Sequence, residues 1–123
     1  MQVFYSSREA AEPADARHFS GPVLVQRTEA AASPHVPVYR VEFAPGARTH
    51  WHTHSGVQIL LITEGRGRVQ KWGEGVREVS AGDTVSIAPG DKHWHGAARD
   101  ARMVHLAVNI DATTTWMEPV EGD

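Results

Sequence analysis

The chain has 123 residues, a formal net charge of −3 and no cysteine. This length predicts a single domain, residues 1–123. Without cysteine, the chain can form neither disulfides nor a thiolate-ligated zinc site, and it has no cysteine nucleophile. The slightly acidic charge, without any long basic run, argues against nucleic acid and an anionic membrane surface as partners. With no signal-peptide pattern and no apolar run of membrane-spanning length, we expect a soluble, cytoplasmic protein.

Short strand-like segments alternate with turn residues along the chain. Residues 1–20 are mixed and could form only a short helical turn, and residues 28–37 predict a loop. Glu64 to Gly67 predicts a hairpin turn after an apolar run that we expect to be buried on both faces. About nine short strands with turn signals between them are typical of an all-β sandwich or barrel. The expected strands are Val23–Arg27, Val38–Phe43, a histidine-bearing strand before Ser55, Val57–Thr63, Arg68–Trp72, Val76–Ser80, Thr84–Ala88, His93–His95 and Arg102–Ile110.

Histidines are concentrated in three of these segments. His50, His52 and His54 occupy alternate positions, and alternate side chains of a strand point to the same face. The same parity relates His93 to His95. Neutral imidazole is the commonest protein ligand for transition metals, so the pattern predicts a metal site inside a barrel. The remaining members of the candidate site are Gln58 and His105.

Two motifs resemble those of the cupin family. The first has Gly, His-x-His, usually Glu, and Gly at fixed spacings; here these positions hold Gly46, His52 with His54, Gln58 and Gly65. Gln58 stands where the family usually has Glu. The second motif is matched by Gly82-Asp83, Ile87, Pro89-Gly90 and His93. The resemblance covers residues 38–110 and implies a cupin jelly roll.

Further stretches resemble the small bacterial cupin hydroxynitrile lyases, which are manganese-dependent. They include Pro-Gly-Ala-Arg-Thr-x-Trp-His-Thr-His and Pro-Gly-x-Lys-His-Trp-His-Gly-Ala-Ala. The resemblance implies a divalent transition metal, with Mn(II) favoured over Fe(II) and with nickel and zinc left open. It also implies catalytic roles for His95 and His105. His50 departs from those lyases, which carry a small residue there. The implied metal ligands are His52, His54, Gln58 and His93.

Four neutral ligands would leave the full charge of the ion available to polarise an oxygen of the substrate. His95 shares the parity of His93 and could act as a general acid or base, or only hold a ligand by a hydrogen bond. His105 shares its face with Met103 and Ala107. His50 is assigned to the pocket as a third catalytic candidate, and Thr49 then points to the opposite face unless the strand is irregular.

The leading functional hypothesis is a metal-dependent lyase that cleaves or forms cyanohydrins. The ion would hold the substrate oxygen while a histidine takes the hydroxyl proton. An Fe(II)-dependent dioxygenase is the first alternative, and a binding module without turnover is the second. The expected partners are a small-molecule substrate and further copies of the chain, since the resemblance implies a homodimer or homotetramer.

Overall fold

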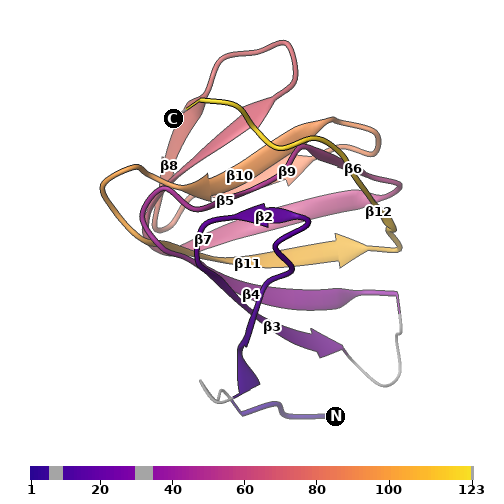
Figure 1. Ribbon diagram of the computed structural model, residues 1–123. Coiled ribbons are helices and arrows are strands. Elements are labelled where there is room, and N and C mark those ends of the chain that lie inside the picture. Colours follow the sequence, from indigo (N-terminus) through magenta and orange to yellow (C-terminus); the bar gives the residue numbers. More distant parts are fainter. Residues whose placement is uncertain (6–9, 30–34, 123) are drawn as a thin grey trace.

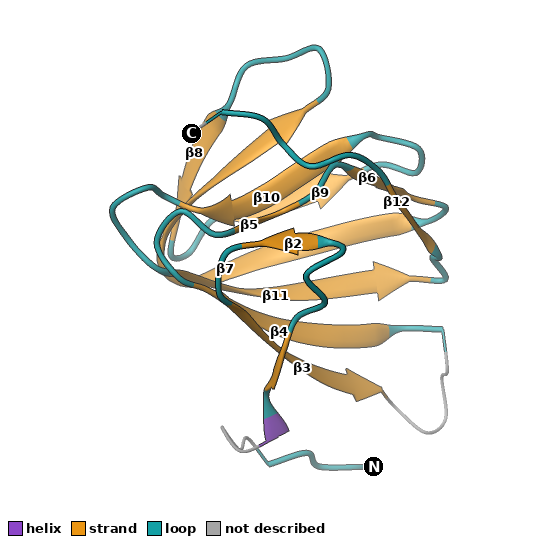
Figure 2. Cartoon of the chain, viewed as in Figure 1, coloured by secondary structure: helices purple, strands orange, loops and turns teal. Residues whose placement is uncertain are grey.

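The computed structural model describes residues 1–5, 10–29 and 35–122. Almost all of its regular structure is β-strand (Figure 2). No helix in this part of the chain is long and apolar enough to cross a membrane. The strands are β1 (Glu12–Pro13), β2 (Phe19–Ser20), β3 (Val23–Glu29), β4 (Pro37–Phe43), β5 (Arg48–Thr49), β6 (His52–His54), β7 (Val57–Lys71), β8 (Arg77–Ser80), β9 (Thr84–Ile87), β10 (His93–Ala97), β11 (Met103–Ile110) and β12 (Thr114–Trp116).

The strands form two antiparallel sheets that face each other (Figure 1). The first sheet has the order β1-β3-β4-β11-β7-β9, and β11 lies at its centre between β4 and β7. The second sheet contains β2, β5, β6, β8, β10 and β12 together with the second half of β7. This arrangement confirms the predicted all-β fold.

Strand β7 is the connection between the two sheets, and it corrects one prediction. Glu64 to Gly67 does not form a hairpin turn. The strand continues through Gly65, which has a φ of 74°, and its pairing with β11 ends there while its pairing with β8 begins at Arg66. Two predicted strands are therefore one strand of 15 residues with a corner at Gly65.

The expected histidine strand is also interrupted. It consists of β5 and β6, separated by His50 and Trp51. Three short strands, β1, β2 and β12, were not predicted. In the described part of the N-terminal segment, Ala10 is helical and is followed by strand β1 and a turn at residues 16–18 (Figure 2). The helical turn that the sequence allowed therefore does not extend past Ala10, and residues 6–9 lie outside the described residues.

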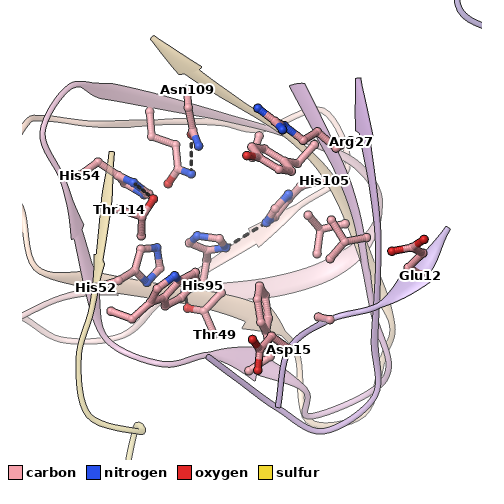
Figure 3. Close-up of a pocket in the computed structure, with 18 of the residues that line it drawn as sticks. Glu12, Asp15, Arg27, Thr49, His52, His54, His95, His105, Asn109 and Thr114 are labelled. Atoms are coloured by element: carbon pink, nitrogen blue, oxygen red, sulfur yellow. Dashed lines mark hydrogen bonds between the residues drawn. The ribbon is translucent and has the colours of Figure 1, made fainter. Parts of the chain in front are cut away.

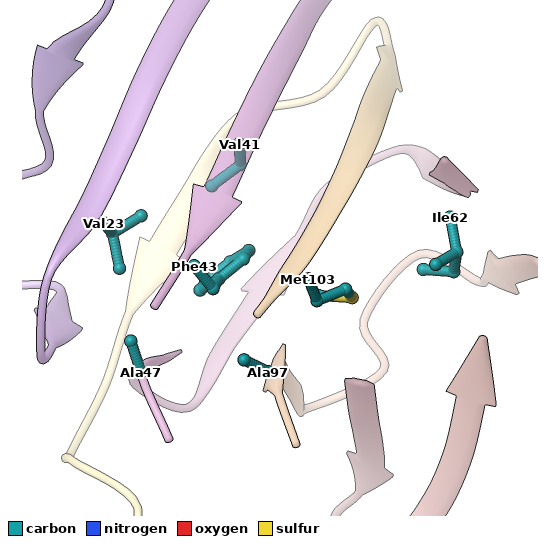
Figure 4. Close-up of a cluster of buried hydrophobic side chains, with 7 residues drawn as sticks. All are labelled: Val23, Val41, Phe43, Ala47, Ile62, Ala97 and Met103. Carbon is teal, nitrogen blue, oxygen red and sulfur yellow. The ribbon is translucent and has the colours of Figure 1, made fainter. Parts of the chain in front are cut away.

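An apolar core fills one end of the space between the sheets (Figure 4). Phe43 and Met103 are fully buried and pair across β4 and β11. Val23 and Val41 extend the core along the first sheet, and Ala97 closes it from the second. Because alternate residues of a strand share a face, the side chains two and four residues further along these strands also point between the sheets. They lie beside the core, at the candidate site.

The outer face of the first sheet is apolar along its two central strands. Leu61 lies opposite Leu106, and Ile59 lies opposite Val108. Contrary to the expectation for Val57–Thr63, only one face of this segment is buried in the single chain. Leu61 keeps 37% of its surface exposed, whereas its neighbours Leu60 and Ile62 are buried.

Candidate metal centre and active site

A cavity of about 560 Å³ lies between the two sheets beside the apolar core (Figure 3). The second sheet contributes His52, His54 and His95 to its wall, and the first sheet contributes Gln58 and His105. Figure 3 shows Glu12 and Arg27 on the side of the cavity away from His52 and His54. Apolar and aromatic side chains complete the wall, among them Phe19, Val25, Tyr39, Val41 and Trp116.

Three buried histidines form a group that could hold a metal ion. One ring nitrogen from each of His52, His93 and His95 lies within 4.8 Å of the others. The strand register explains the proximity, because His93 of β10 is paired with His52 of β6 and lies two residues before His95. The rings of His52 and His93 have centroids 4.2 Å apart.

Hydrogen bonds to the backbone fix the tautomers of two of these rings. Nδ1 of His52 lies 2.8 Å from the carbonyl of His50, and Nδ1 of His93 lies 2.7 Å from the carbonyl of Asp91. A carbonyl only accepts, so both Nδ1 atoms must donate. Burial lowers the pKa of His93 to about 4 and the pKa of His52 well below its usual range, so both rings are neutral near pH 7. Each therefore has a bare lone pair on Nε2.

Gln58 presents a further lone pair to the same region. Its Nε2 donates to Oδ1 of Asn109 at 2.8 Å, which turns its Oε1 towards Nε2 of His93, 3.2 Å away. Neither atom of this last pair carries a hydrogen in the neutral state, so they repel each other unless a positive charge lies beside them. A cation between the two lone pairs would replace this repulsion by attraction to both. The residues therefore fit a divalent metal ion.

His54 has the same type of tether with a different partner. Its Nδ1 lies 2.9 Å from Oγ1 of Thr114 in β12, and its buried Nε2 has no hydrogen-bond partner. Burial lowers the pKa of this ring as well. Its ring centroid lies 4.9 Å from that of His52 and 5.3 Å from that of His93. His54 thus adds an unpaired buried nitrogen next to the three-histidine group.

His95 and His105 form a buried pair, which we call the histidine dyad. Nδ1 of His95 and Nε2 of His105 are 2.9 Å apart and share one hydrogen, and their other nitrogens have no partner. Burial lowers the pKa of His105 to about 4 and that of His95 well below its usual range. When both rings are neutral, one outer nitrogen carries a hydrogen and the other is bare. The dyad therefore offers an acid at one end and a base at the other.

Two predicted features are placed differently from the sequence expectation. His50 is buried, yet it does not line the cavity. Thr49 does line the cavity, and its Oγ1 accepts a hydrogen bond from the backbone N–H of His95. The interruption after β5 reverses the alternation, so Thr49 points inwards where His50 was expected. The geometry brings the other six predicted residues together and leaves His50 outside. His93 does not line this cavity itself, but it lies against His52 and Gln58, which do.

Two polar cavity residues beside the candidate metal set, Asn109 and Thr114, were missed by the sequence interpretation. Asn109 follows His105 and Ala107 at alternate positions of β11, and this parity would have identified it. Thr114 and Trp116 belong to β12, which pairs with β6 and carries the ring of Trp116 to 4.6 Å from that of His52. No local pattern in the sequence marks Thr114 as part of the site.

Comparison with known proteins agrees with this fold. The sequence model of the cupin domain family matches residues 39–109. The chain belongs to the cupin family. The prediction made from the two motifs is thereby confirmed.

Individual relatives are similar over nearly the whole chain. The (R)-mandelonitrile lyase of Granulicella tundricola is 40% identical, with 100% of this chain and 97% of that protein covered. A cupin-like protein from Thermotoga maritima is 36% identical with a TM-score of 0.86, covering 98% of this chain and 92% of that one. A predicted oxalate decarboxylase of the same organism, 24% identical with a TM-score of 0.78 over 89% and 98% of the two chains, shares the fold.

Proposed function

We propose that this protein is a metal-dependent lyase that cleaves cyanohydrins to an aldehyde and HCN, and forms them in the reverse direction. The observation that carries the proposal is the juxtaposition of a cation-binding set of lone pairs with the histidine dyad. Similarity to a mandelonitrile lyase over the full chain supports the choice of substrate class.

Within the site, we assign the metal to His52, His54, Gln58 and His93 and the proton transfer to the dyad. The unpaired Nε2 of His54 and the lone pair of Gln58 support the four-ligand set. His95 is close enough to be a ligand itself, but its hydrogen bond to His105 suits proton transfer equally well. A divalent ion bound there, with Mn(II) favoured, would act as a Lewis acid that stabilises negative charge on a substrate oxygen.

The dyad accepts the hydroxyl proton of the substrate and later returns a proton to cyanide. The bare outer nitrogen of His95 or His105 takes the hydroxyl proton of the cyanohydrin while the bond between the carbinol carbon and the nitrile carbon breaks. The electron pair of that bond leaves with cyanide, and the hydroxyl carbon becomes the aldehyde carbonyl. The dyad then returns one proton to cyanide as HCN, so the proton count of the protein is unchanged. The low pKa of both rings keeps them neutral near pH 7, which is the state in which one outer nitrogen is bare.

The cavity has the size and walls for an aromatic substrate. Its volume of about 560 Å³ lies within the usual range for small-molecule pockets. Phe19, Tyr39 and Trp116 line it, and Val25 and Val41 add apolar surface. Such walls would hold an aromatic ring and keep water from the carbon–carbon bond that breaks.

The test of this function is cyanide release from mandelonitrile by Mn(II)-loaded protein under anaerobic conditions. We expect release well above that of metal-free protein, and a loss of roughly 100-fold or more in kcat for His105→Leu, as for removal of a general base. The metal content of this variant should equal that of the wild type. Absence of cyanide release from metal-loaded protein would contradict the lyase, and oxygen uptake with an aromatic substrate would favour the dioxygenase.

We further propose that the protein is a homodimer that pairs through the outer face of its first sheet. Leu61, Leu106, Ile59 and Val108 form the centre of this face, and Ile110 at its edge is 42% exposed. The charged side chains beside it already neutralise one another, so no net charge opposes a second copy of the same face. These pairs are Arg40 with Glu64, Arg102 with Glu42 and Arg102 with Glu64.

A charge placed in this face should separate the copies. The wild-type chain of 13.5 kDa is expected to have twice that mass by light scattering after size-exclusion chromatography, whereas Leu61→Glu should have the mass of one chain. The reason is that an unpaired carboxylate would be buried between the copies. Val76→Glu, at an exposed apolar residue of the other sheet's hairpin, is the matched control and should remain dimeric. A monomeric wild type, or a dimeric Leu61→Glu, would contradict the proposal.

A further inference from the structure

Asn109 stands out among the cavity residues because it makes one specific contact with the candidate metal set. It is buried in β11 opposite Gln58 of β7, and its Oδ1 accepts a hydrogen bond from Nε2 of Gln58 at 2.8 Å. Among the described residues, this is the one hydrogen bond between Asn109 and the candidate metal set. We call Gln58 and Asn109 the amide pair.

The amide pair has two arrangements that both keep its hydrogen bond. In the observed arrangement, Oε1 of Gln58 faces Nε2 of His93. If both amides turn over, Asn109 donates to Oε1 of Gln58, and the NH₂ group of Gln58 faces His93 instead. An amide carbonyl binds a cation, whereas an NH₂ group repels it.

The surroundings of Gln58 decide which arrangement each state of the site prefers. Nε2 of His93 is a bare acceptor, because its Nδ1 donates to the carbonyl of Asp91. Without a cation, this acceptor is satisfied best by the NH₂ group of Gln58. With a cation present, Nε2 of His93 and Oε1 of Gln58 can both point their lone pairs at the ion.

We propose that Asn109 is a positioning residue whose hydrogen bond anchors the Gln58 amide at the metal site, so that Oε1 of Gln58 can face the ion as in the observed arrangement. The inference rests on the cation site of the proposed function. A residue at 109 that can only accept would hold Gln58 with its oxygen towards the ion, and a residue without polar atoms would leave the amide free to present its NH₂ group. Asparagine allows both arrangements, so it also allows the metal-free site to satisfy its own hydrogen bonds.

The test is the dissociation constant of Mn(II), measured by calorimetry or metal competition on purified full-length variants. We expect Asn109→Leu, which has the same number of side-chain heavy atoms but no polar atom, to bind Mn(II) about 10- to 100-fold more weakly than the wild type, as for loss of a group that orients a ligand. Asn109→Asp should bind it at least as tightly as the wild type, since a carboxylate accepts from Nε2 of Gln58.

A Gln58→Glu background separates positioning from packing. A carboxylate presents an oxygen whichever way it turns, so Asn109→Leu should cost Gln58→Glu protein no more than a few-fold in Mn(II) affinity. An equal loss in both backgrounds would overturn the inference, as would unchanged affinity in Asn109→Leu. Lack of cyanide release with metal bound would count against the lyase alone, whereas failure of the wild type to bind any divalent metal would overturn both proposals.

Discussion

Replacing His52 by alanine is expected to weaken Mn(II) binding by roughly 100-fold or more and to reduce cyanide release to that of metal-free protein. Changes to groups that merely orient a ligand typically cost 10- to 100-fold, so removal of a ligand should cost at least as much. His52 is central to the site because its ring is near those of His54, His93 and His95. Metal content by mass spectrometry and affinity by calorimetry measure the effect directly.

His50→Ala is the matched control for this experiment. It removes the same side chain two positions earlier, outside the cavity lining, and it leaves the backbone carbonyl that fixes the His52 ring. We expect this variant to keep its metal and its activity. If His50→Ala lost activity while keeping the metal, the catalytic role that the sequence suggested for His50 would be supported after all. If His52→Ala kept full metal affinity, the proposed metal set would be wrong.

Replacing Gly65 by alanine is expected to destabilise the fold by about 4 kcal/mol or more. A Cβ atom at Gly65 would overlap the carbonyl oxygen of Arg102, and the residue has a φ of 74°. Both obstacles lie at the corner where β7 passes from one sheet to the other, so neither strand can shift without disturbing both sheets. The melting temperature should fall by roughly 10 °C or more, which calorimetry or circular dichroism would detect.

Gly73→Ala separates the two causes of this loss. Gly73 has a φ of 85°, but no other group lies within 4 Å of the position of its Cβ. It should therefore show only the backbone cost of a left-handed residue, about 1–2 kcal/mol. Similar losses for Gly65→Ala and Gly73→Ala would mean that the contact with Arg102 relaxes easily and that the corner is not rigid.

Local patterns in the sequence predicted most of the longer strands and several residues of the cavity wall. Alternation assigned His105 and Ala107 to one face, and the structure places both on the cavity wall. The two motifs are sufficient to identify the family from the sequence alone. These inferences succeeded because a strand of regular pairing has a strict period of two, so residue spacing alone determines which side chains share a face.

The strand predictions failed where the backbone forms hydrogen bonds with segments that are distant in the sequence. The N–H of His50 donates to the carbonyl of His18, and the N–H of Trp51 donates to the carbonyl of Glu118. These bonds interrupt the strand, reverse its alternation and bring Thr49 into the cavity. A turn signal such as Glu64 to Gly67 is likewise ambiguous, because the same glycine allows either a hairpin or a corner. Which one forms depends on β8 and β11, far along the chain.

The central position of β11 has a consequence for the kinetics of folding. It pairs on one side with β4, so that Phe43 meets Met103, and on the other with β7. During synthesis, β4 and β7 are made long before the strand that fits between them, and each exposes an unpaired edge until β11 inserts. Contacts so distant in sequence favour slow folding, and exposed edges favour aggregation. Because His105 lies in β11, the histidine dyad is assembled only in this late step.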